Sequence, residues 1–179
     1  MITFVIPSLG RPSLQHALNS LYTQTDPDWK AVVAFDNVAP TIPSTEQIST
    51  VMAHPKGVWR AGLVRNRAIE QVRTPWVGCL DDDDSLYPDY VATHKQMVKE
   101  YPEADIFSYK MINQDGRTLP DAHALICNHI GISFAFHIKV FQKVRFRQQK
   151  CEDYLFLRDA RRLGFKLTFV DRLLYKVKQ

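Results

Sequence analysis

Short apolar runs alternate with helical patterns over the first half of the chain, and this alternation constrains the fold more than any other feature. The apolar runs of strand length are residues 2–6, 30–35, 49–53 and 76–80. Helical spacing of apolar residues separates them: one helix begins at Pro12, which suits a first helical turn, and another covers 61–72 before Pro75. Strands joined by helices pair in parallel and are covered on both faces. The sequence therefore predicts an α/β fold with a mostly parallel central sheet flanked by helices.

The second half of the chain contains further strands and two more helices. One helix starts at Pro88, and another covers 152–163 and ends at Gly164, a common C-terminal cap. The strand-like runs of this half are residues 104–112, 131–138, 166–170 and 173–177. With no internal repeat and no low-complexity linker, we predict one domain over residues 1–179.

The composition is that of a soluble globular protein and argues against several functional classes. Of the 179 residues 45% are apolar, and the net charge of +4 comes from scattered basic residues, which does not indicate nucleic-acid binding. No apolar stretch approaches the roughly 20 residues of a membrane span, and no signal-peptide pattern opens the chain. Cys79, Cys127 and Cys151 lack a paired spacing, so we expect reduced thiols and a cytoplasmic location.

Polar residues follow the apolar runs where the predicted strands end. Ser8 comes after Pro7, Asp36 follows the second run, and four consecutive acids, 81–84, follow the fourth. Two carboxylates about 5 Å apart repel by about 3 kcal/mol at an effective dielectric of 20. The acids can be solvated on a turn, one can keep its proton, or a divalent cation can lie among them. Because ligands of open α/β sheets bind at the carboxyl ends of strands, the coincidence favours a binding site.

Four segments of the chain form a recognisable set. In order they read "VIPSLGRP", "VVAFDN", "GLVRNRAIEQVRTPWVGCLDDDDSLYPDYV" and "CEDYLFLRDARRLGFK". Together they resemble the nucleotide-sugar-dependent glycosyltransferases of the GT-A fold, in particular the inverting family 2. The resemblance runs from residue 2 to about residue 175. It implies a single GT-A, Rossmann-like domain in which residues 1–100 bind the nucleotide sugar and 101–179 form the acceptor side, and this domain can be a piece of a longer chain.

The resemblance assigns the acidic run to a divalent cation and a nucleotide diphosphate. Mn²⁺ or Mg²⁺ stabilises the charge that builds on the leaving diphosphate, and such hard ions prefer carboxylate ligands. By this resemblance Asp81 contacts the ribose, Asp83 binds the metal directly, and Asp84 helps directly or through water. Asp82 falls at the variable position of the motif within the donor site, and its carboxylate is expected to be dispensable.

The resemblance also implies the residues that hold the nucleotide. Asp36 would accept a hydrogen bond from the base, most often uracil, and Pro7 and Ser8 would line the same base and ribose pocket. Arg65 matches the arginine of an "ARN" segment that faces the nucleotide, and its planar guanidinium suits a phosphate or a base. Arg11 is a weaker candidate, because "GRP" also serves simply as a turn and helix start.

An inverting transfer needs a base that takes the proton from the acceptor hydroxyl. The resemblance implies that Asp153 is this base and that Glu152 orients it or shapes the acceptor pocket. Acids are also common in the first helical turn for reasons of the helix dipole. Some family members complete the metal shell with a C-terminal histidine, but none follows His137, so the shell would rely on the acids, the diphosphate and water.

The sequence thus predicts an inverting, metal-dependent glycosyltransferase that uses a nucleotide sugar, most often a UDP-sugar, and a glycan or other hydroxyl acceptor. Three alternatives stay open. "DDDDS" also fits phosphatases with an aspartate nucleophile, although their motif usually follows the first strand of the domain. A nucleotidyltransferase would need a more glycine-rich N-terminal loop than "PSLGRPS". A catalytically inactive nucleotide-sugar-binding module is the third.

Overall fold

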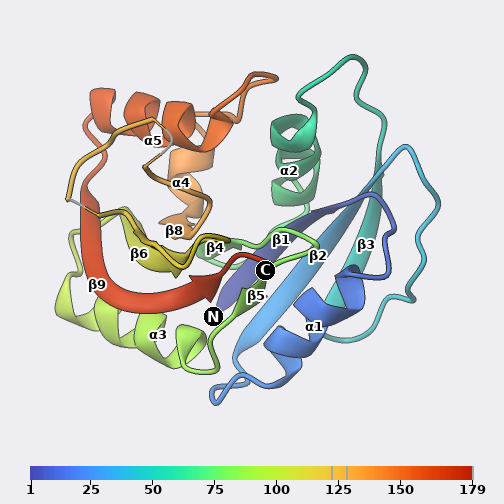
Figure 1. The fold of residues 1–179 in the computed structure, drawn as a ribbon, viewed down its shortest axis with the longest axis horizontal. Helices are drawn as coiled ribbons and strands as arrows, with labels where there is room; N and C mark the ends of the chain where they lie inside the picture. Colours follow the sequence, from blue (N-terminus) through green and yellow to red (C-terminus); the bar gives the residue numbers. More distant parts are fainter. Residues whose placement is uncertain (122, 128, 179) are drawn as a thin grey trace.

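The computed structural model describes residues 1–121, 123–127 and 129–178 as one α/β domain (Figure 1). The helices are α1 (Leu14–Tyr22), α2 (Ala61–Ile69), α3 (Tyr90–Glu100), α4 (Ile138–Phe141) and α5 (Glu152–Arg162). The strands are β1 (Ile2–Ser8), β2 (Trp29–Asp36), β3 (Ile48–Ala53), β4 (Trp76–Cys79), β5 (Ser85–Leu86), β6 (Ile106–Ile112), β7 (Thr118–Leu119), β8 (Phe134–His137) and β9 (Leu167–Lys176).

The strands form one curled sheet in the order β3-β2-β1-β4-β8-β6-β9-β5, with β7 paired to β6. From β3 to β4 all pairs are parallel, as the alternation of strand and helix predicts. Beyond β4 the sheet is mixed, because β8 runs antiparallel to both β4 and β6, while β9 is parallel to β6. The α/β fold is therefore confirmed, and its parallel part is the first half of the chain.

The second half of the chain departs from the predicted elements in two places. The predicted strand 131–138 is shorter at both ends: β8 begins only at Phe134, and after His137 the chain turns into the helix α4, whose first turn is capped by the His137 ring. The two predicted closing strands are one continuous strand, β9, whose pairing with β6 shifts register around Lys110. A register shift of this kind bends a strand, and here it accompanies the curl of β9 around the sheet (Figure 1).

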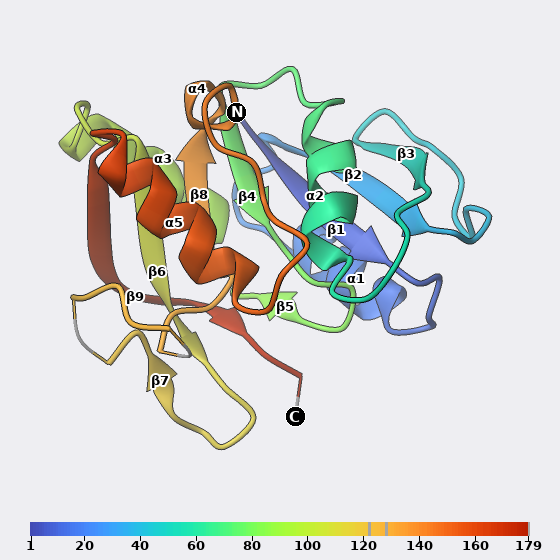
Figure 2. The same ribbon diagram turned by 90° about the horizontal axis from the view of Figure 1, so that it is seen from above.

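Helices cover both faces of the sheet. Figure 1 shows α1 and α3 on one side and α2, α4 and α5 on the other, and Figure 2 shows the N-terminal end of α5 lying beside α2. The strands β1 and β2 are buried almost throughout, as expected for parallel strands covered on both faces. Gly78 of β4 leaves room for its neighbour: a Cβ there would lie 2.7 Å from the ring of Phe4.

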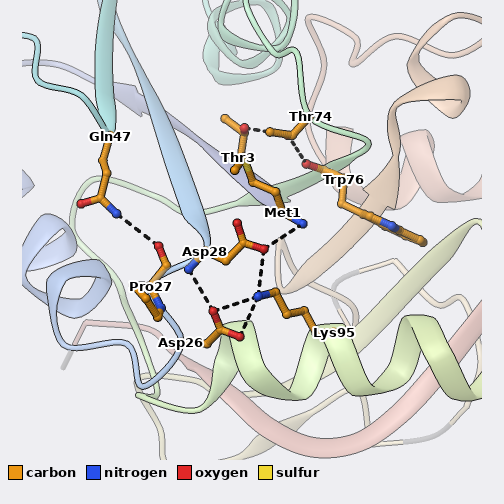
Figure 3. A network of polar contacts seen from close by, with 9 residues as sticks. All are labelled: Met1, Thr3, Asp26, Pro27, Asp28, Gln47, Thr74, Trp76 and Lys95. Atoms are coloured by element: carbon orange, nitrogen blue, oxygen red, sulfur yellow. Dashed lines mark hydrogen bonds and ion pairs between the residues drawn. The ribbon is translucent and has the colours of Figure 1, made fainter.

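An ionic network lies at the amino-terminal ends of the parallel strands, opposite the carboxyl ends of β1, β2 and β4. The Lys95 ammonium of α3 donates to Asp26 at 2.8 Å and lies 2.8 Å from Asp28, and the amino group of Met1 lies 3.2 Å from the same Asp28 carboxylate (Figure 3). Hydrogen bonds from Lys95 lower the pKa of both acids. Because these groups are partly exposed, we attribute about 0.5 kcal/mol to each pair. The network joins α3 to the turn that precedes β2.

Candidate functional site

A pocket of ≈ 480 Å³ opens at the carboxyl ends of β1, β2 and β4. These strands are parallel neighbours, so the residues that follow them along the chain meet at one edge of the sheet. The pocket is lined by Pro7, Ser8, Leu9, Asp36, Gly57, Val58, Trp59, Arg60, Ala61, Val64, Arg65, Asp81, Asp82 and Asp83. The structure thus brings most of the predicted nucleotide-binding residues into one cavity.

Arg65 joins the acidic run to the helix α5. Its Nη2 donates to Oδ1 of Asp81 at 2.5 Å, and its Nη1 donates to Oε1 of Glu152 at 2.6 Å. The side chain is 3% exposed, and although this burial alone would lower the pKa of Arg65, the two carboxylates raise it, so the guanidinium stays charged. The buried Nε has no hydrogen-bond partner within the described residues. Arg65 is therefore a buried cation at the wall of the pocket, between its two carboxylates.

Glu152 contacts Arg65 of α2, a partner that the sequence did not suggest. We expected Glu152 to orient Asp153 or to shape the acceptor pocket, but its carboxylate accepts from Arg65 of α2. An arginine and a carboxylate 87 residues apart thus hold the start of α5 against α2. Glu152 fixes Asp153 indirectly, by anchoring the helix turn to which both residues belong.

Asp153 lies in the first turn of α5, next to Glu152. Its Oδ1 accepts from the backbone N–H of Tyr154 at 2.7 Å. Burial raises the pKa of Asp153 to about 6, while the Tyr154 hydrogen bond opposes this increase and the neighbouring Glu152 charge adds to it. A carboxyl group that titrates near neutral pH can accept a proton during a reaction and release it afterwards.

Asp82 is buried and bonded, which the sequence did not predict. Its Oδ2 accepts from the hydroxyl of Ser8 at 2.7 Å and from the backbone N–H of Leu9 at 3.2 Å. The Ser8 hydroxyl also accepts from the backbone N–H of Gly10. Asp82 thus holds the loop after β1, which forms one wall of the pocket, while its expected dispensability stays a prediction.

Asp84, which we expected to help bind the metal directly or through water, is buried and hydrogen-bonded to the C-terminal segment. Its Oδ2 accepts from the hydroxyl of Tyr175 at 2.7 Å, and its Oδ1 accepts from the backbone N–H of Lys178 at 3.0 Å. Burial raises the pKa of Asp84 to about 6, although both hydrogen bonds oppose it. Both oxygens accept from the C-terminal segment, and the residues lining the pocket do not include Asp84. Its predicted help to the metal, directly or through water, stays a prediction.

Asp83 is the acid of the run with no short ionic or hydrogen-bond contact within the described residues. Its side chain is 37% exposed and lines the pocket, and the nearest cation, Nη1 of the exposed Arg11, is 3.9 Å away. Arg11 itself does not line the pocket. No cluster of three or more potential metal ligands exists within the described residues. Asp83 is therefore the acid of the run whose carboxylate is exposed to the pocket.

Asp36 lies at the end of β2 and lines the same pocket. Its Oδ2 accepts from Nε of Arg60 at 3.1 Å, and its Oδ1 accepts from the side-chain amide of Asn37 at 2.7 Å. Each oxygen keeps a lone pair for a further donor. Trp59 is 58% exposed with a left-handed φ of 57°, and it lines the pocket beside Val58. This end of the pocket thus combines a carboxylate, a guanidinium and an apolar wall.

Asn66 does not line the pocket, but it helps to hold the elements around it, a role that the sequence did not indicate. Its amide donates to the carbonyl of Phe146 at 2.8 Å and accepts from the N–H of Phe146 at 3.0 Å. The pair ties α2 to the segment that leads into α5, beside the Arg65–Glu152 contact. The only sequence signal was its place in "VRNR", directly after Arg65.

Comparisons with known proteins identify the family. The single α/β domain with its curled mixed sheet matches glycosyltransferase structures of the GT-A fold. The sequence matches the profile described as glycosyl transferase family 2 over residues 3–157. The chain belongs to this family, which confirms the predicted resemblance. A comparison with curated protein sequences gave no match.

Solved structures share the fold at low sequence identity. The chain aligns with S. aureus TarS 1-349 in complex with UDP-GlcNAc at a TM-score of 0.80 and 18% identity, covering 99% of this chain and 58% of that one. For TarS 1-349 in complex with UDP the TM-score is 0.81 at 18% identity, with 99% and 60% covered. Mannosyltransferase PcManGT from Pyrobaculum calidifontis in complex with GDP-Man and Mn²⁺ gives 0.72 at 14%, with 98% and 56% covered. The chain thus spans about 60% or less of these structures. Within the part of the chain that the structure describes, no helix is long and apolar enough to cross a bilayer.

Proposed function

We propose that the chain transfers a sugar from a nucleotide diphosphate donor, a UDP-sugar, to an acceptor hydroxyl with inversion at the anomeric carbon. The observation that carries this proposal is the arrangement around one pocket. Asp36 lies at one strand end, Asp81 and Asp83 lie at another, and Arg65 connects Asp81 to the helix that bears Asp153. The family match favours this reaction over that of a phosphatase with an aspartate nucleophile.

The donor would lie along the pocket from Asp36 to the acidic run. Asp36 accepts from an N–H of the base, and the ribose lies near Asp81. The pocket volume of ≈ 480 Å³ is within the range of ligand sites for small organic molecules. Two of the structural neighbours were solved with UDP-GlcNAc or UDP, which supports a uridine donor, whereas PcManGT was solved with GDP-Man.

A divalent cation fits the free carboxylate of Asp83. Mn²⁺ or Mg²⁺ bound there would neutralise charge on the leaving diphosphate. Because Asp84 is held by Tyr175 and Lys178, we propose Asp83 as the ligand from the acidic run, with the remaining ligands supplied by the diphosphate and water. The Mn²⁺ in the PcManGT structure supports the choice of ion.

Asp153 would act as the general base. Its ionised carboxylate takes the proton of the acceptor hydroxyl as that oxygen attacks the anomeric carbon. The bond between this carbon and the diphosphate oxygen breaks on the opposite face, so the configuration inverts. Glu152 and Arg65 keep the first turn of α5 in place while Asp153 holds the proton.

Titration with UDP in the presence and absence of Mn²⁺ tests the donor assignment directly. Calorimetry should detect UDP binding that is stronger with Mn²⁺, and Asp83→Ala should remove the Mn²⁺ dependence. The matched control is Asp89→Ala, an exposed aspartate at the start of α3 that does not line the pocket. If UDP does not bind with or without the ion, the donor assignment is wrong.

Donor hydrolysis separates an enzyme from an inactive binding module. A glycosyltransferase without its acceptor should release UDP slowly from the UDP-sugar that it binds, because water can replace the acceptor hydroxyl. UDP-GlcNAc is the first donor to try, with phosphate release measured in parallel. UDP release from UDP-GlcNAc without inorganic phosphate supports sugar transfer. Release of phosphate from UDP, with UDP-GlcNAc left intact, supports the phosphatase, because only UDP carries a terminal phosphate. Binding without any hydrolysis supports the inactive module.

A further inference from the structure

Cys127 and Cys151 are distant in the sequence but adjacent in the structure. Their Sγ atoms lie 2.7 Å apart across a separation of 24 residues. A disulfide bond is about 2.05 Å long, so a small side-chain movement brings the two atoms to bonding distance. Cys79, by contrast, is buried within β4. The linear spacing of the cysteines, from which we expected only reduced thiols, does not reveal this proximity.

The pair of cysteines is accessible to a dissolved oxidant. Cys127 is exposed, and Cys151 is half-buried at the N-cap of α5. Cys151 has a left-handed backbone, with φ 58° and ψ 38°, which is a strained conformation for a residue with a Cβ. Its carbonyl accepts from the N–H of Leu155 at 3.0 Å, which is the first hydrogen bond of the helix. The residue that contacts Cys127 is therefore the one that sets the start of α5.

We propose that Cys127 and Cys151 are a redox modification site, which forms a reversible disulfide between residues 123–127 and the start of α5. The next two residues after Cys151 are Glu152, which holds Arg65, and Asp153. The cross-link would restrict the helix turn that bears both acids. Its effect on sugar transfer rests on the proposed function, but its formation does not.

The oxidant would be a small-molecule disulfide such as oxidised glutathione. Cys127 is exposed and Cys151 is half-buried, so Cys127 is the sulfur that meets the oxidant first. The hydrogen bond with Cys127, together with burial, raises the pKa of Cys151 to about 11. The Cys127 thiolate attacks one sulfur of the oxidant, whose S–S bond breaks and releases one thiolate. The Cys151 thiolate then attacks Cys127 and releases the second. The protein loses two protons and two electrons, and the oxidant becomes two thiols.

Peptide mapping under non-reducing conditions tests the site without any assay of activity. The purified chain is equilibrated with defined ratios of reduced to oxidised glutathione, alkylated, digested and analysed by mass spectrometry. We expect a linked peptide pair containing Cys127 and Cys151, with Cys79 alkylated only after unfolding. Dithiothreitol should abolish the link. In Cys127→Ser, the peptide that contains Cys151 should not be disulfide-linked to any other peptide of the chain. A stable mixed disulfide between glutathione and wild-type Cys127, or no linked pair at any ratio, would overturn the proposal.

Thermal unfolding and UDP binding then show whether the disulfide forms in most molecules and what it changes. A disulfide that closes a loop of this length should raise the Tm of the oxidised chain by about 5–10 °C over the reduced chain. Cys127→Ser and Cys151→Ser should show no such difference between oxidising and reducing buffer. Oxidised and reduced protein should bind UDP equally, because neither cysteine lines the pocket, while transfer by the oxidised form should be several-fold slower. Equal transfer rates would remove the regulatory part of the proposal.

Discussion

Asp153 is the residue whose surroundings bear most directly on the proposed chemistry. Burial raises its pKa to about 6, so this carboxyl group is largely protonated at pH 5 and largely ionised at pH 7. Because the base must be ionised to accept a proton, kcat/KM for transfer should increase with pH and level off above about pH 7. At pH 5 it should be about tenfold below this plateau, whereas an aspartate of ordinary pKa would give almost full activity there.

Asp84 provides the control for this pH profile, since burial raises its pKa to the same value of about 6. Asp84→Asn keeps an oxygen that can accept from Tyr175, and it should retain the inflection near pH 6 if Asp153 is the base. Asp153→Asn should lower transfer by about 10²–10⁴-fold while UDP still binds. If the inflection disappears in Asp84→Asn, or Asp153→Asn keeps full activity, Asp153 is not the base.

At the scale of elements, Arg65 is the main polar connection between α2, the acidic run and α5. Arg65→Met would leave the partly buried carboxylates of Asp81 and Glu152 without their counter-charge. Removing one partner of a buried pair costs about 3–5 kcal/mol, and because both acids are partly exposed we expect a loss of about 2 kcal/mol. Urea unfolding monitored by tryptophan fluorescence measures this difference.

Arg67 is the matched control on the same helix. It is exposed, and its one ion pair within the described residues is with Glu70 three residues on, so Arg67→Ala should change the free energy of unfolding by less than about 0.5 kcal/mol. Arg65→Met combined with Glu152→Met should recover part of the loss, because it removes one of the stranded charges. Equal stability of Arg65→Met and Arg67→Ala would mean that Arg65 does not hold the elements together.

Over the whole molecule, the sequence predicts those features of the fold and the site that a local pattern of residues determines. The apolar runs and helical faces predict the parallel half of the sheet, and strand ends predict that Ser8, Asp36 and Asp81 approach one another. Contacts between remote segments carry no such signal. Asp84 meets Tyr175 across 91 residues, which requires knowing that β9 curls back past the acidic run. The two-residue strands β5 and β7 are likewise too short to show a periodicity.

A buried histidine in the core, His94, should make the stability of the whole chain depend on pH. His94 is 2% exposed, and its Nδ1 lies 2.7 Å from the hydroxyl of Tyr109, while its buried Nε2 has no partner within the described residues. Burial lowers the pKa of His94 to about 3, below the value of about 6.5 for an unfolded chain. Between these values the unfolded state binds the extra proton, so acid favours unfolding, and stability decreases as pH falls below about 6.5.

Asp84 and Asp153 act in the opposite direction, because their raised pKa values let the native state bind protons first between about pH 6 and 4. The dependence due to His94 is therefore clearest as a difference between variants. From pH 7 to 4.5 the free energy of unfolding of the wild type should fall by about 2 kcal/mol more than that of His94→Phe. The exposed His16, changed to Gln, should leave the wild-type slope unaltered. Urea titrations at the two pH values measure these slopes, and parallel slopes for wild type and His94→Phe would show that His94 is not the group that acid protonates on unfolding.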